Sequence, residues 1–266
     1  MAVKTDGTLW AWGTSSRGGL GLNDSSVARS SPVQVGTLNT WSKISAAPDI
    51  TQAIETDGTL YSWGYNVNGE LGLNDRDNRS SPVQVGVPIY GWSKITTASD
   101  GIAAIKGDGT LWTWGKGTNG LLGDNTILSR SSPVQIGALT TWSSVNNGGY
   151  GYNMTAIKTD GTIWTWGQNL NGSLGDNTVI SRSSPIQVGA LTTWSLIASN
   201  HYHVIAAKTD RTLWSWGKAD SGQLGNSSLI SRSSPVQIGT ASDSGSSWYK
   251  LAPGIAFTAA IESVPF

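Results

Sequence analysis

The sequence repeats itself five times at a spacing of about 51 residues, and this periodicity restricts the chain to a repeat architecture. Each copy keeps, in the same order, an Asp-Gly-Thr-Leu-Trp-like segment, a Trp-Gly pair, a Gly-x-Leu-Gly segment, an Arg-Ser-Ser-Pro segment and a lone tryptophan. The tryptophans of the Trp-Gly pairs lie 51, 51, 52 and 50 residues apart, at Trp12, Trp63, Trp114, Trp166 and Trp216. Chance does not keep several markers in step five times, so we expect five similar structural units.

One unit reads as four short strands. In the third copy an apolar run ending at Lys106 leads through Asp108-Gly109 into a second run ending at Trp114. Asp-Gly between two β-rich runs predicts a tight hairpin. A loop rich in Gly and Asn then leads to a third strand near Pro133, which suits a sheet edge, and Trp142 begins the fourth. Four strands in about 50 residues, without helical periodicity, predict a propeller blade.

We therefore predict an all-β fold, a β-propeller of five four-stranded blades formed as a single domain by residues 1–266. The chain starts inside a unit, and its Ala2-Val3-Lys4 aligns with Ala260-Ile261-Glu262 near the other end. The stretch from about Ala252 to Glu262 can supply the strand that the first blade lacks. Closing the ring through complementary N- and C-terminal strands would keep the faces between blades away from water.

Charge and composition disfavour several classes of function. The chain has 17 basic and 17 acidic residues, so we expect no nucleic-acid partner. Only 13% of residues are charged, and the polar surface must come from Ser, Thr, Asn, Gln and Gly, as is common on secreted and virion proteins. Cysteine is absent and no apolar run is long enough to span a bilayer, so we expect neither thiolate metal sites nor membrane insertion.

Catalysis has little material in this sequence. The only histidines, His201 and His203, lie in one copy, which is too few for a His-rich metal site. The acidic residues mostly occupy repeated turn positions, where Asp is usually a turn former. No P-loop motif is present. We therefore predict no enzyme activity, no cofactor and no metal ion.

The repeated tryptophans and arginines have structural interpretations. We expect the tryptophans to pack between blades, the alternative being an aromatic cage for a ligand. We expect each arginine of the Arg-Ser-Ser-Pro segments to pair with a nearby loop Asp or to cap carbonyls, the alternative being a ring that grips an anion. These arginines are Arg29, Arg79, Arg130, Arg182 and Arg232.

The repeat itself is similar to a known one. The order Ala-Ile-Lys-x-Asp-Gly-Thr-Leu-Trp-x-Trp-Gly, then Asn-x-x-Gly-x-Leu-Gly, then Ser-Ser-Pro-Val-Gln-Val closely resembles the regulator of chromosome condensation repeat over essentially the whole chain. The resemblance implies a propeller of four-stranded blades. The best-known member has seven blades and exchanges guanine nucleotide on a small GTPase, whereas other members are binding propellers. This chain has five units and no basic tail, so we do not carry the exchange activity over.

The copies differ most between the lone tryptophan and the Ala-Ile strand, so we expect the partner-binding surface there. By the family resemblance this segment enters the innermost strand and crowds one end of the central channel. Its Tyr, His and Asp side chains suit a sugar or a protruding peptide, and the alternative is that they only fill the axis. The candidate partner-binding residues are Asp49, Asp100, Tyr150, Tyr152, His201, Tyr202 and His203.

These observations favour a non-catalytic recognition module that binds a protein or carbohydrate on one propeller face, alone or within a larger assembly. A virion appendage or a secreted adhesin fits the composition, so an extracellular or virion location is favoured over the cytoplasm. The alternative function is an intracellular protein-interaction regulator of the guanine-nucleotide-exchange-factor type.

Overall fold

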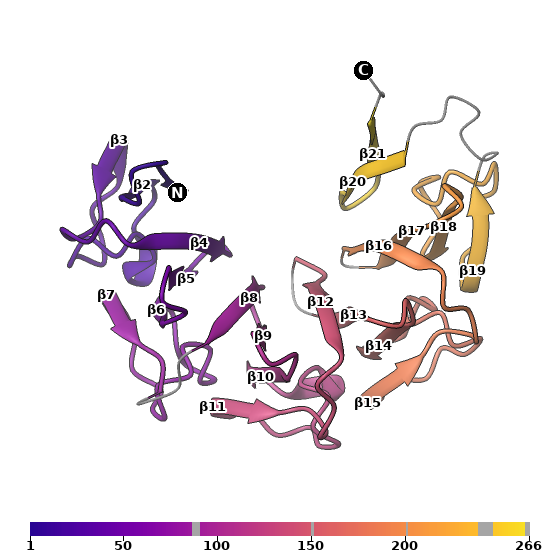
Figure 1. Cartoon of the computed structure of the whole chain (residues 1–266), viewed down its shortest axis with the longest axis horizontal. Helices are drawn as coiled ribbons and strands as arrows, with labels where there is room; N and C mark the ends of the chain where they lie inside the picture. Colours follow the sequence, from indigo (N-terminus) through magenta and orange to yellow (C-terminus); the bar gives the residue numbers. More distant parts are fainter. Residues whose placement is uncertain (87–90, 150–151, 201, 239–246, 264–266) are drawn as a thin grey trace. The chain divides into compact units, whose positions relative to one another are not determined.

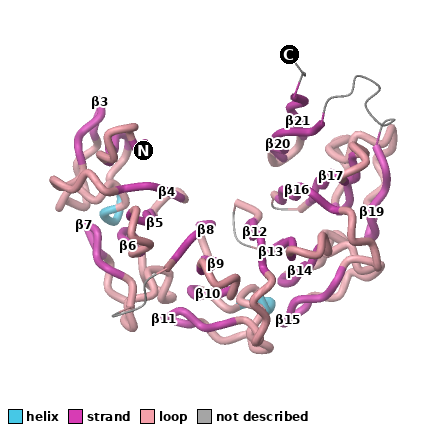
Figure 2. The backbone as a smooth tube through the Cα atoms, viewed as in Figure 1, coloured by secondary structure: helices cyan, strands magenta, loops and turns pink. Residues whose placement is uncertain are grey.

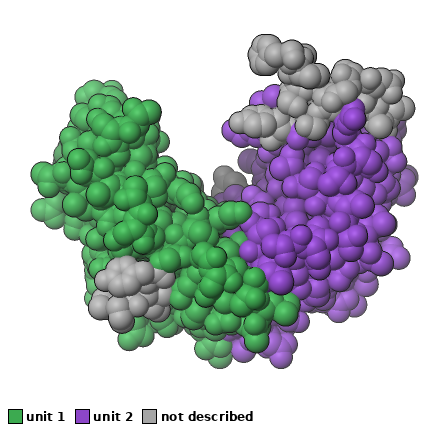
Figure 3. Space-filling model, in the orientation of Figure 1, with its two compact units in different colours: residues 1–118, 128–140 green, residues 119–127, 141–266 purple. Residues whose placement is uncertain are grey.

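The protein is described by a computed structural model that covers residues 1–86, 91–149, 152–200, 202–238 and 247–263. Within these ranges the regular structure is almost entirely antiparallel sheet, and the helical segments are two single turns, η1 (Ser16–Gly18) and η2 (Thr118–Gly120) (Figures 1 and 2). The chain divides into two compact units (Figure 3). Unit 1 consists of residues 1–118 and 128–140, and unit 2 of residues 119–127 and 141–266. The single domain over residues 1–266 stays a prediction.

Unit 1 contains three sheets in which neighbouring strands are antiparallel and follow chain order. The first sheet has three strands, β1 (Ala2–Val3), β2 (Leu9–Gly13) and β3 (Arg29–Gln34). The second has four, β4 (Trp41–Ala46), β5 (Ile50–Glu55), β6 (Leu60–Gly64) and β7 (Arg79–Gln84). The third has four, β8 (Trp92–Thr97), β9 (Gly101–Lys106), β10 (Leu111–Gly115) and β11 (Arg130–Gln135).

Unit 2 repeats the same plan. One four-stranded sheet consists of β12 (Trp142–Asn147), β13 (Asn153–Lys158), β14 (Ile163–Gly167) and β15 (Arg182–Gln187). The next consists of β16 (Trp194–Ser199), β17 (His203–Lys208), β18 (Leu213–Gly217) and β19 (Arg232–Ile238). A final two-stranded sheet pairs β20 (Ser247–Pro253) with β21 (Thr258–Ser263).

The predicted all-β propeller with five blades is confirmed, the first blade having three described strands and the others four. Closure through the chain ends stays a prediction. By alignment, β1 and β21 are both counterparts of the Ala-Ile strand, and β20 is a counterpart of the lone-tryptophan strand.

One detail of the sequence analysis is wrong. The family resemblance implies that the variable segment leads into the innermost strand of a blade, but the Ala-Ile strand that follows this segment is second in every four-stranded sheet. The lone-tryptophan strand forms the edge instead, as β4 does beside β5. The variable segments are therefore the turns between the first and second strands.

The Asp-Gly-Thr-Leu-Trp segment forms a hairpin turn held by a short polar relay. The carboxylate of Asp108 accepts hydrogen bonds from the backbone N–H and the hydroxyl of Thr110, at 3.0 and 2.7 Å. The Thr110 oxygen accepts the indole N–H of Trp112 at 2.9 Å. These bonds to Thr110 hold the pKa of Asp108 below its usual value. The acidic residues at this repeated position are therefore turn formers, as predicted.

A repeated clasp joins each blade to the next. The indole N–H of Trp114 donates to the carbonyl oxygen of Glu70, in the Gly-x-Leu-Gly segment of the preceding blade, at 3.0 Å. Four residues further on, the N–H of Asn74 donates to the carbonyl of Ser131 in the following blade at 2.6 Å. The equivalent indole bonds run from Trp63 to Gly19, from Trp166 to Leu121 and from Trp216 to Ser173. All four indoles are completely buried, which confirms that these tryptophans pack between blades.

The lone tryptophans complete the core of each blade. Trp92 is buried and meets Trp112 and Trp114 edge-on, with ring centroids 6.1 and 5.8 Å apart. The ammonium of Lys106 lies 4.3 Å from the ring centre of Trp112 and 5.1 Å from that of Trp92. Burial lowers the pKa of Lys106. The rings of Trp92 and Trp112 thus contact a lysine of the same chain.

The clasp predicts a specific glycine requirement at Gly72. A Cβ there would lie 2.9 Å from the indole nitrogen of Trp114, whereas a Cβ at Gly137 would meet nothing within 4 Å. Both glycines have positive φ, so alanine at either costs about 1–2 kcal/mol of strain. We expect Gly72→Ala to cost a further ~1–3 kcal/mol by overpacking. Thermal unfolding of the two variants measures the difference, and equal melting temperatures would contradict the clasp.

Candidate functional site

The variable turns share one backbone frame. In each four-stranded sheet, the last residue of the turn between the first and second strands accepts a hydrogen bond at its backbone carbonyl oxygen. The donor is the backbone N–H of the residue that directly follows the Trp-Gly pair. We call this last residue the turn position. The bonds run from Tyr65 to Asp49, from Lys116 to Asp100, from Gln168 to Tyr152 and from Lys218 to Tyr202, at 2.9, 2.7, 2.7 and 2.9 Å. The frame is therefore constant, whereas the side chain at the turn position is acidic in unit 1 and aromatic in unit 2.

The turn positions of unit 1 form a charged cluster. Asp49 pairs with Arg17 at 3.2 Å and accepts the hydroxyl of Ser16 at 2.6 Å. The Arg17 guanidinium also lies over the ring of Tyr65, 4.4 Å from its centre. Asp100 pairs with the ammonium of Lys116 at 2.9 Å. Both ion pairs are partly exposed, so they orient side chains at the surface and stabilise the fold only weakly.

A cavity of about 240 Å³ opens within this charged cluster. Arg17, Asp49 and Tyr65 line it together with Asp100. The remaining lining residues are Pro48, Ile50 and Ser99. The cavity therefore combines an aromatic face, a cation and two carboxylates.

The turn positions of unit 2 form an aromatic pair. The rings of Tyr152 and Tyr202 are stacked, with centroids 6.4 Å apart and planes inclined by 13°. The ammonium of Lys218 lies 5.1 Å from the ring centre of Tyr202 and pairs with Asp220 at 2.9 Å. Unit 2 therefore presents aromatic surface beside one ion pair, where unit 1 presents two ion pairs.

The other predicted site residues have different positions. His203 lies at the start of β17, and its side chain is completely buried. It therefore offers no surface to a partner. Tyr150 and His201 lie outside the described residues. The structure thus brings Asp49 near Asp100 around one cavity, and Tyr152 against Tyr202.

The environment of His203 fixes its tautomer. The hydroxyl of Thr258 donates to the carbonyl of Gln223 at 2.8 Å, so its oxygen is left to accept a proton from Nε2 of His203, also 2.8 Å away. Nδ1 then carries no proton, and it has no partner among the described residues. Protonating Nδ1 would bury an unpaired charge, and burial lowers the pKa of His203 to about 4.

This depressed pKa predicts a pH dependence of stability. In the unfolded chain the histidine has an ordinary pKa near 6.5, so below this pH it binds a proton that the folded protein does not bind. The free energy of unfolding therefore decreases as the pH falls from about 6.5 to about 4. The loss amounts to roughly 3 kcal/mol. His203→Asn places there the residue that Asn153 provides at the equivalent position, and we expect it to remove this slope. Unfolding free energies measured across this range test it, and parallel curves for both proteins would contradict it.

Three of the repeated arginines pair with a loop Asp, as predicted. Arg29 meets Asp24 at 2.6 Å, Arg79 meets Asp75 at 2.6 Å, and Arg182 meets Asp176 at 2.8 Å. Among the described residues, no group of three or more His, Asp or Glu side chains is placed to hold a metal ion.

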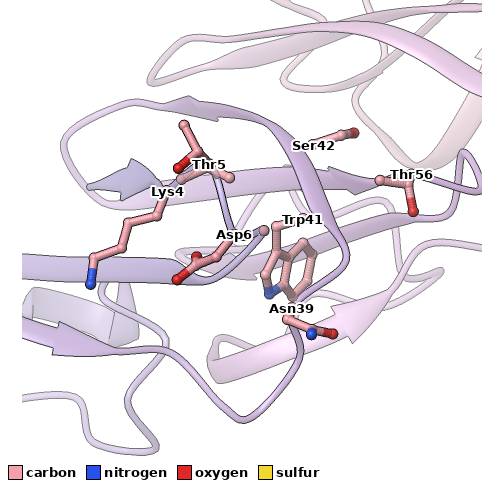
Figure 4. A pocket seen from close by; sticks show the side chains of 9 residues that line it. Lys4, Thr5, Asp6, Asn39, Trp41, Ser42 and Thr56 are labelled. Atoms are coloured by element: carbon pink, nitrogen blue, oxygen red, sulfur yellow. The ribbon is translucent and has the colours of Figure 1, made fainter.

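Two further surface hollows lie away from the turn positions. The first, in unit 1, has a volume of about 430 Å³ and is lined by Lys4, Asp6, Trp41 and neighbouring polar residues (Figure 4). The second, in unit 2, has a volume of about 390 Å³ and contains Trp194 and Trp214. The Lys4 ammonium lies over Trp10 at 3.9 Å, and Asp6 accepts hydrogen bonds from Thr8, so these groups serve the local turn.

Sequence reasoning missed the partners of the turn positions. Arg17, Tyr65, Lys116 and Lys218 all come from the loop that follows the Trp-Gly pair. The signal that could have found them is the variation of this loop between copies, since Tyr65, Lys116, Gln168 and Lys218 occupy equivalent places.

The clasped, four-stranded blades and their variable turns define a repeat β-propeller. The model of the regulator of chromosome condensation (RCC1) repeat matches residues 6–54, 57–104, 108–151, 160–207 and 211–261. The chain therefore belongs to the RCC1 repeat family.

Similar proteins include the ultraviolet-B receptor UVR8 of Arabidopsis thaliana, 30% identical over 193 residues, which cover 71% of this chain and 43% of the receptor. The mitochondrial RCC1 domain-containing protein RUG3 of the same plant is 31% identical over 206 residues, covering 72% of this chain and 45% of RUG3. The chain thus spans under half the length of these relatives. Among solved structures, Prp20p of Saccharomyces cerevisiae matches 98% of this chain and 65% of its own, with a TM-score of 0.80 and 15% identity. The structure of human WBSCR16 matches 96% of this chain and 67% of its own chain, with a TM-score of 0.80 and 20% identity.

Among the described residues, no helix is both long and apolar enough to cross a membrane.

Proposed function

We propose that this RCC1-type propeller is a non-catalytic recognition module, and that a partner protein contacts its turn positions. The observation that carries the proposal is the combination of a constant backbone frame with changing side chains, namely Asp49 and Asp100 in one unit and Tyr152 and Tyr202 in the other. Scaffold positions repeat because packing requires it, whereas positions that vary on a fixed frame are free to serve recognition.

The side chains at the turn positions favour a protein over a sugar. Tyrosine and arginine are enriched at the energetic centres of protein interfaces, and charged pairs at a rim set orientation and specificity. Arg17, Tyr152 and Tyr202 supply the first kind of group, and the pairs of Asp49 and Asp100 supply the second. A relative supports the same class of partner, since Prp20p has binding properties toward Gsp1p and histones.

We place the module on a virion or outside the cell. What supports this setting is composition, because only 13% of residues are charged and the polar surface is built from uncharged side chains. The alternative, an intracellular regulator of the exchange-factor type, is supported by membership of the RCC1 repeat family. The nucleotide-exchange assay described below distinguishes it from the recognition module.

The binding surface is tested by site-specific photo-crosslinking. A photoreactive residue at Asp49 or at Tyr202 should capture the same protein from an extract, whereas one at the highly exposed Asp77 should not. We expect Asp49→Asn and Tyr202→Ala each to weaken binding of the captured protein about tenfold, or ~1.4 kcal/mol. Asp49→Asn should melt close to the unaltered protein, because exposed ion pairs contribute only about 0–1 kcal/mol. Equal capture at all three positions, or binding on a glycan array without protein capture, would reject the proposal.

The absence of exchange activity is tested with a small GTPase. Gsp1p loaded with fluorescent GDP should release it at the spontaneous rate when this protein is added, and faster when an exchange-active family member is added. The expectation follows from the zero net charge and from the missing basic tail. Acceleration comparable to that of the active family member would establish the alternative function.

A further inference from the structure

The hollow of about 390 Å³ in unit 2 is built by two successive blades. Its volume falls within the range of roughly 300–1,000 Å³ that is typical of sites for small molecules. The fourth blade contributes Asp176 and Asn177, from the loop after its Gly-x-Leu-Gly segment, and Gln187, at the end of β15. The fifth blade contributes Trp194 and Trp214. All of these residues belong to unit 2, so the hollow is complete within one compact unit.

The one charged side chain of this lining, Asp176, is already satisfied within the protein. One carboxylate oxygen accepts two hydrogen bonds from the guanidinium of Arg182, at 2.8 and 3.0 Å. The other accepts the amide of Asn169 at 3.0 Å and the hydroxyl of Thr178 at 2.7 Å. Asp176 therefore holds the loop in place and offers no free charge to a ligand. Because desolvating an ion without a counter-charge is costly, the hollow suits an uncharged ligand.

Two side-chain amides of the lining are free, in contrast to Asp176. Asn177 and Gln187 are exposed, and neither side chain has a hydrogen-bond partner among the described residues. The backbone of Asn177 is nevertheless fixed, since its N–H donates to the carbonyl of Ser233 at 2.8 Å. In the third copy of the repeat the counterpart of Gln187, Gln135, donates its amide to its own loop at 3.0 Å. The hollow in unit 2 therefore presents hydrogen-bonding groups that its own chain does not use.

Aromatic and aliphatic side chains form much of the remaining lining. Trp194 and Trp214 meet edge-on, with ring centroids 6.0 Å apart and planes inclined by 80°. Leu191, which is 47% exposed, adds aliphatic surface. The face of an indole ring carries partial negative charge and attracts the weakly positive C–H groups of a ligand. The hollow thus combines an aromatic surface with neutral groups that both donate and accept hydrogen bonds.

We propose that this hollow binds a neutral sugar ring. The C–H groups of the sugar pack on the indoles of Trp194 and Trp214, and its hydroxyl groups bond to the amides of Asn177 and Gln187. A hydroxyl both donates and accepts, so neighbouring hydroxyls satisfy the oxygen and the nitrogen of the same amide. This site is separate from the turn positions and does not rest on the protein partner proposed for them.

A peptide fits the same groups less well. An extended segment that adds to the sheet edge needs backbone donors along it, and Pro235 on the edge strand β19 (Arg232–Ile238) has none. A proline-rich segment packs on aromatic surfaces without a sheet edge. Its prolines have no N–H, however, so the side-chain oxygens of Asn177 and Gln187 would receive no hydrogen bond.

Two substitutions remove the amides without altering the packing of the blades. Asn177→Gly keeps a residue that adopts positive φ freely, and Gln187→Ala shortens an exposed side chain. The matched controls are Asn125→Gly and Gln135→Ala, at the same places in the third copy of the repeat. Tyr202→Ala changes a turn position instead, and it tests whether the two sites are independent.

Saturation-transfer NMR with the methyl glycosides of glucose, galactose and mannose is the measurement. Irradiating the indole protons should transfer magnetisation to the ring C–H protons of at least one of these sugars. We expect Asn177→Gly and Gln187→Ala each to weaken its binding about threefold to tenfold, the effect of losing one neutral hydrogen bond. Both matched controls and Tyr202→Ala should bind it as the unaltered protein does.

Three results would overturn the sugar site. The first is the absence of binding for all three glycosides. The second is a glycoside that binds equally to the unaltered protein and to both amide variants, or that is lost in Tyr202→Ala, since either result places it elsewhere. The third is a polyproline peptide that displaces the sugar and binds more tightly than it, with the same dependence on Asn177 and Gln187.

Discussion

The hydrogen bond from a buried indole to the carbonyl of the preceding blade is the interaction on which the rest of this structure depends. It requires a tryptophan on the third strand of a four-stranded blade, a glycine that leaves room for its ring, and a loop that delivers the carbonyl, as Trp114, Gly72 and Glu70 do. An indole N–H at this position without the acceptor would cost about 1–3 kcal/mol, which favours keeping the three parts together. This explains why the Trp-Gly pair and the Gly-x-Leu-Gly segment recur together in every copy of the repeat.

A rigid junction frees the neighbouring turns to vary. The turn positions are anchored by one backbone bond to the residue after the Trp-Gly pair, so Asp49 and Tyr202 occupy the same frame with unrelated side chains. Charge gathers at the turns of unit 1 and aromatic surface at those of unit 2. The packing of the blades and the chemistry of the turn positions thus depend on different residues of each repeat.

The parts of the fold that depend on local sequence were predictable, and the parts that depend on distant contacts were not. Asp108-Gly109 predicts its hairpin because the turn needs only adjacent residues. The position of the Ala-Ile strand within the sheet depends on pairing across a blade, and the inference from resemblance was wrong there. The burial of His203 depends on Thr258, 55 residues away, and the pairing of Asp49 depends on Arg17, 32 residues away. Repetition locates such positions but does not show which way their side chains face.

The role of the indole bond is tested most directly by native-state hydrogen exchange on Trp114→Phe, which keeps a buried ring but removes the N–H. If the bond to Glu70 joins the second and third blades, amides of β6 and β10 should exchange faster in the variant, while those of β14 and β18 keep their protection. Unchanged exchange at β6 and β10, or an equal loss of protection at all four strands, would contradict the account.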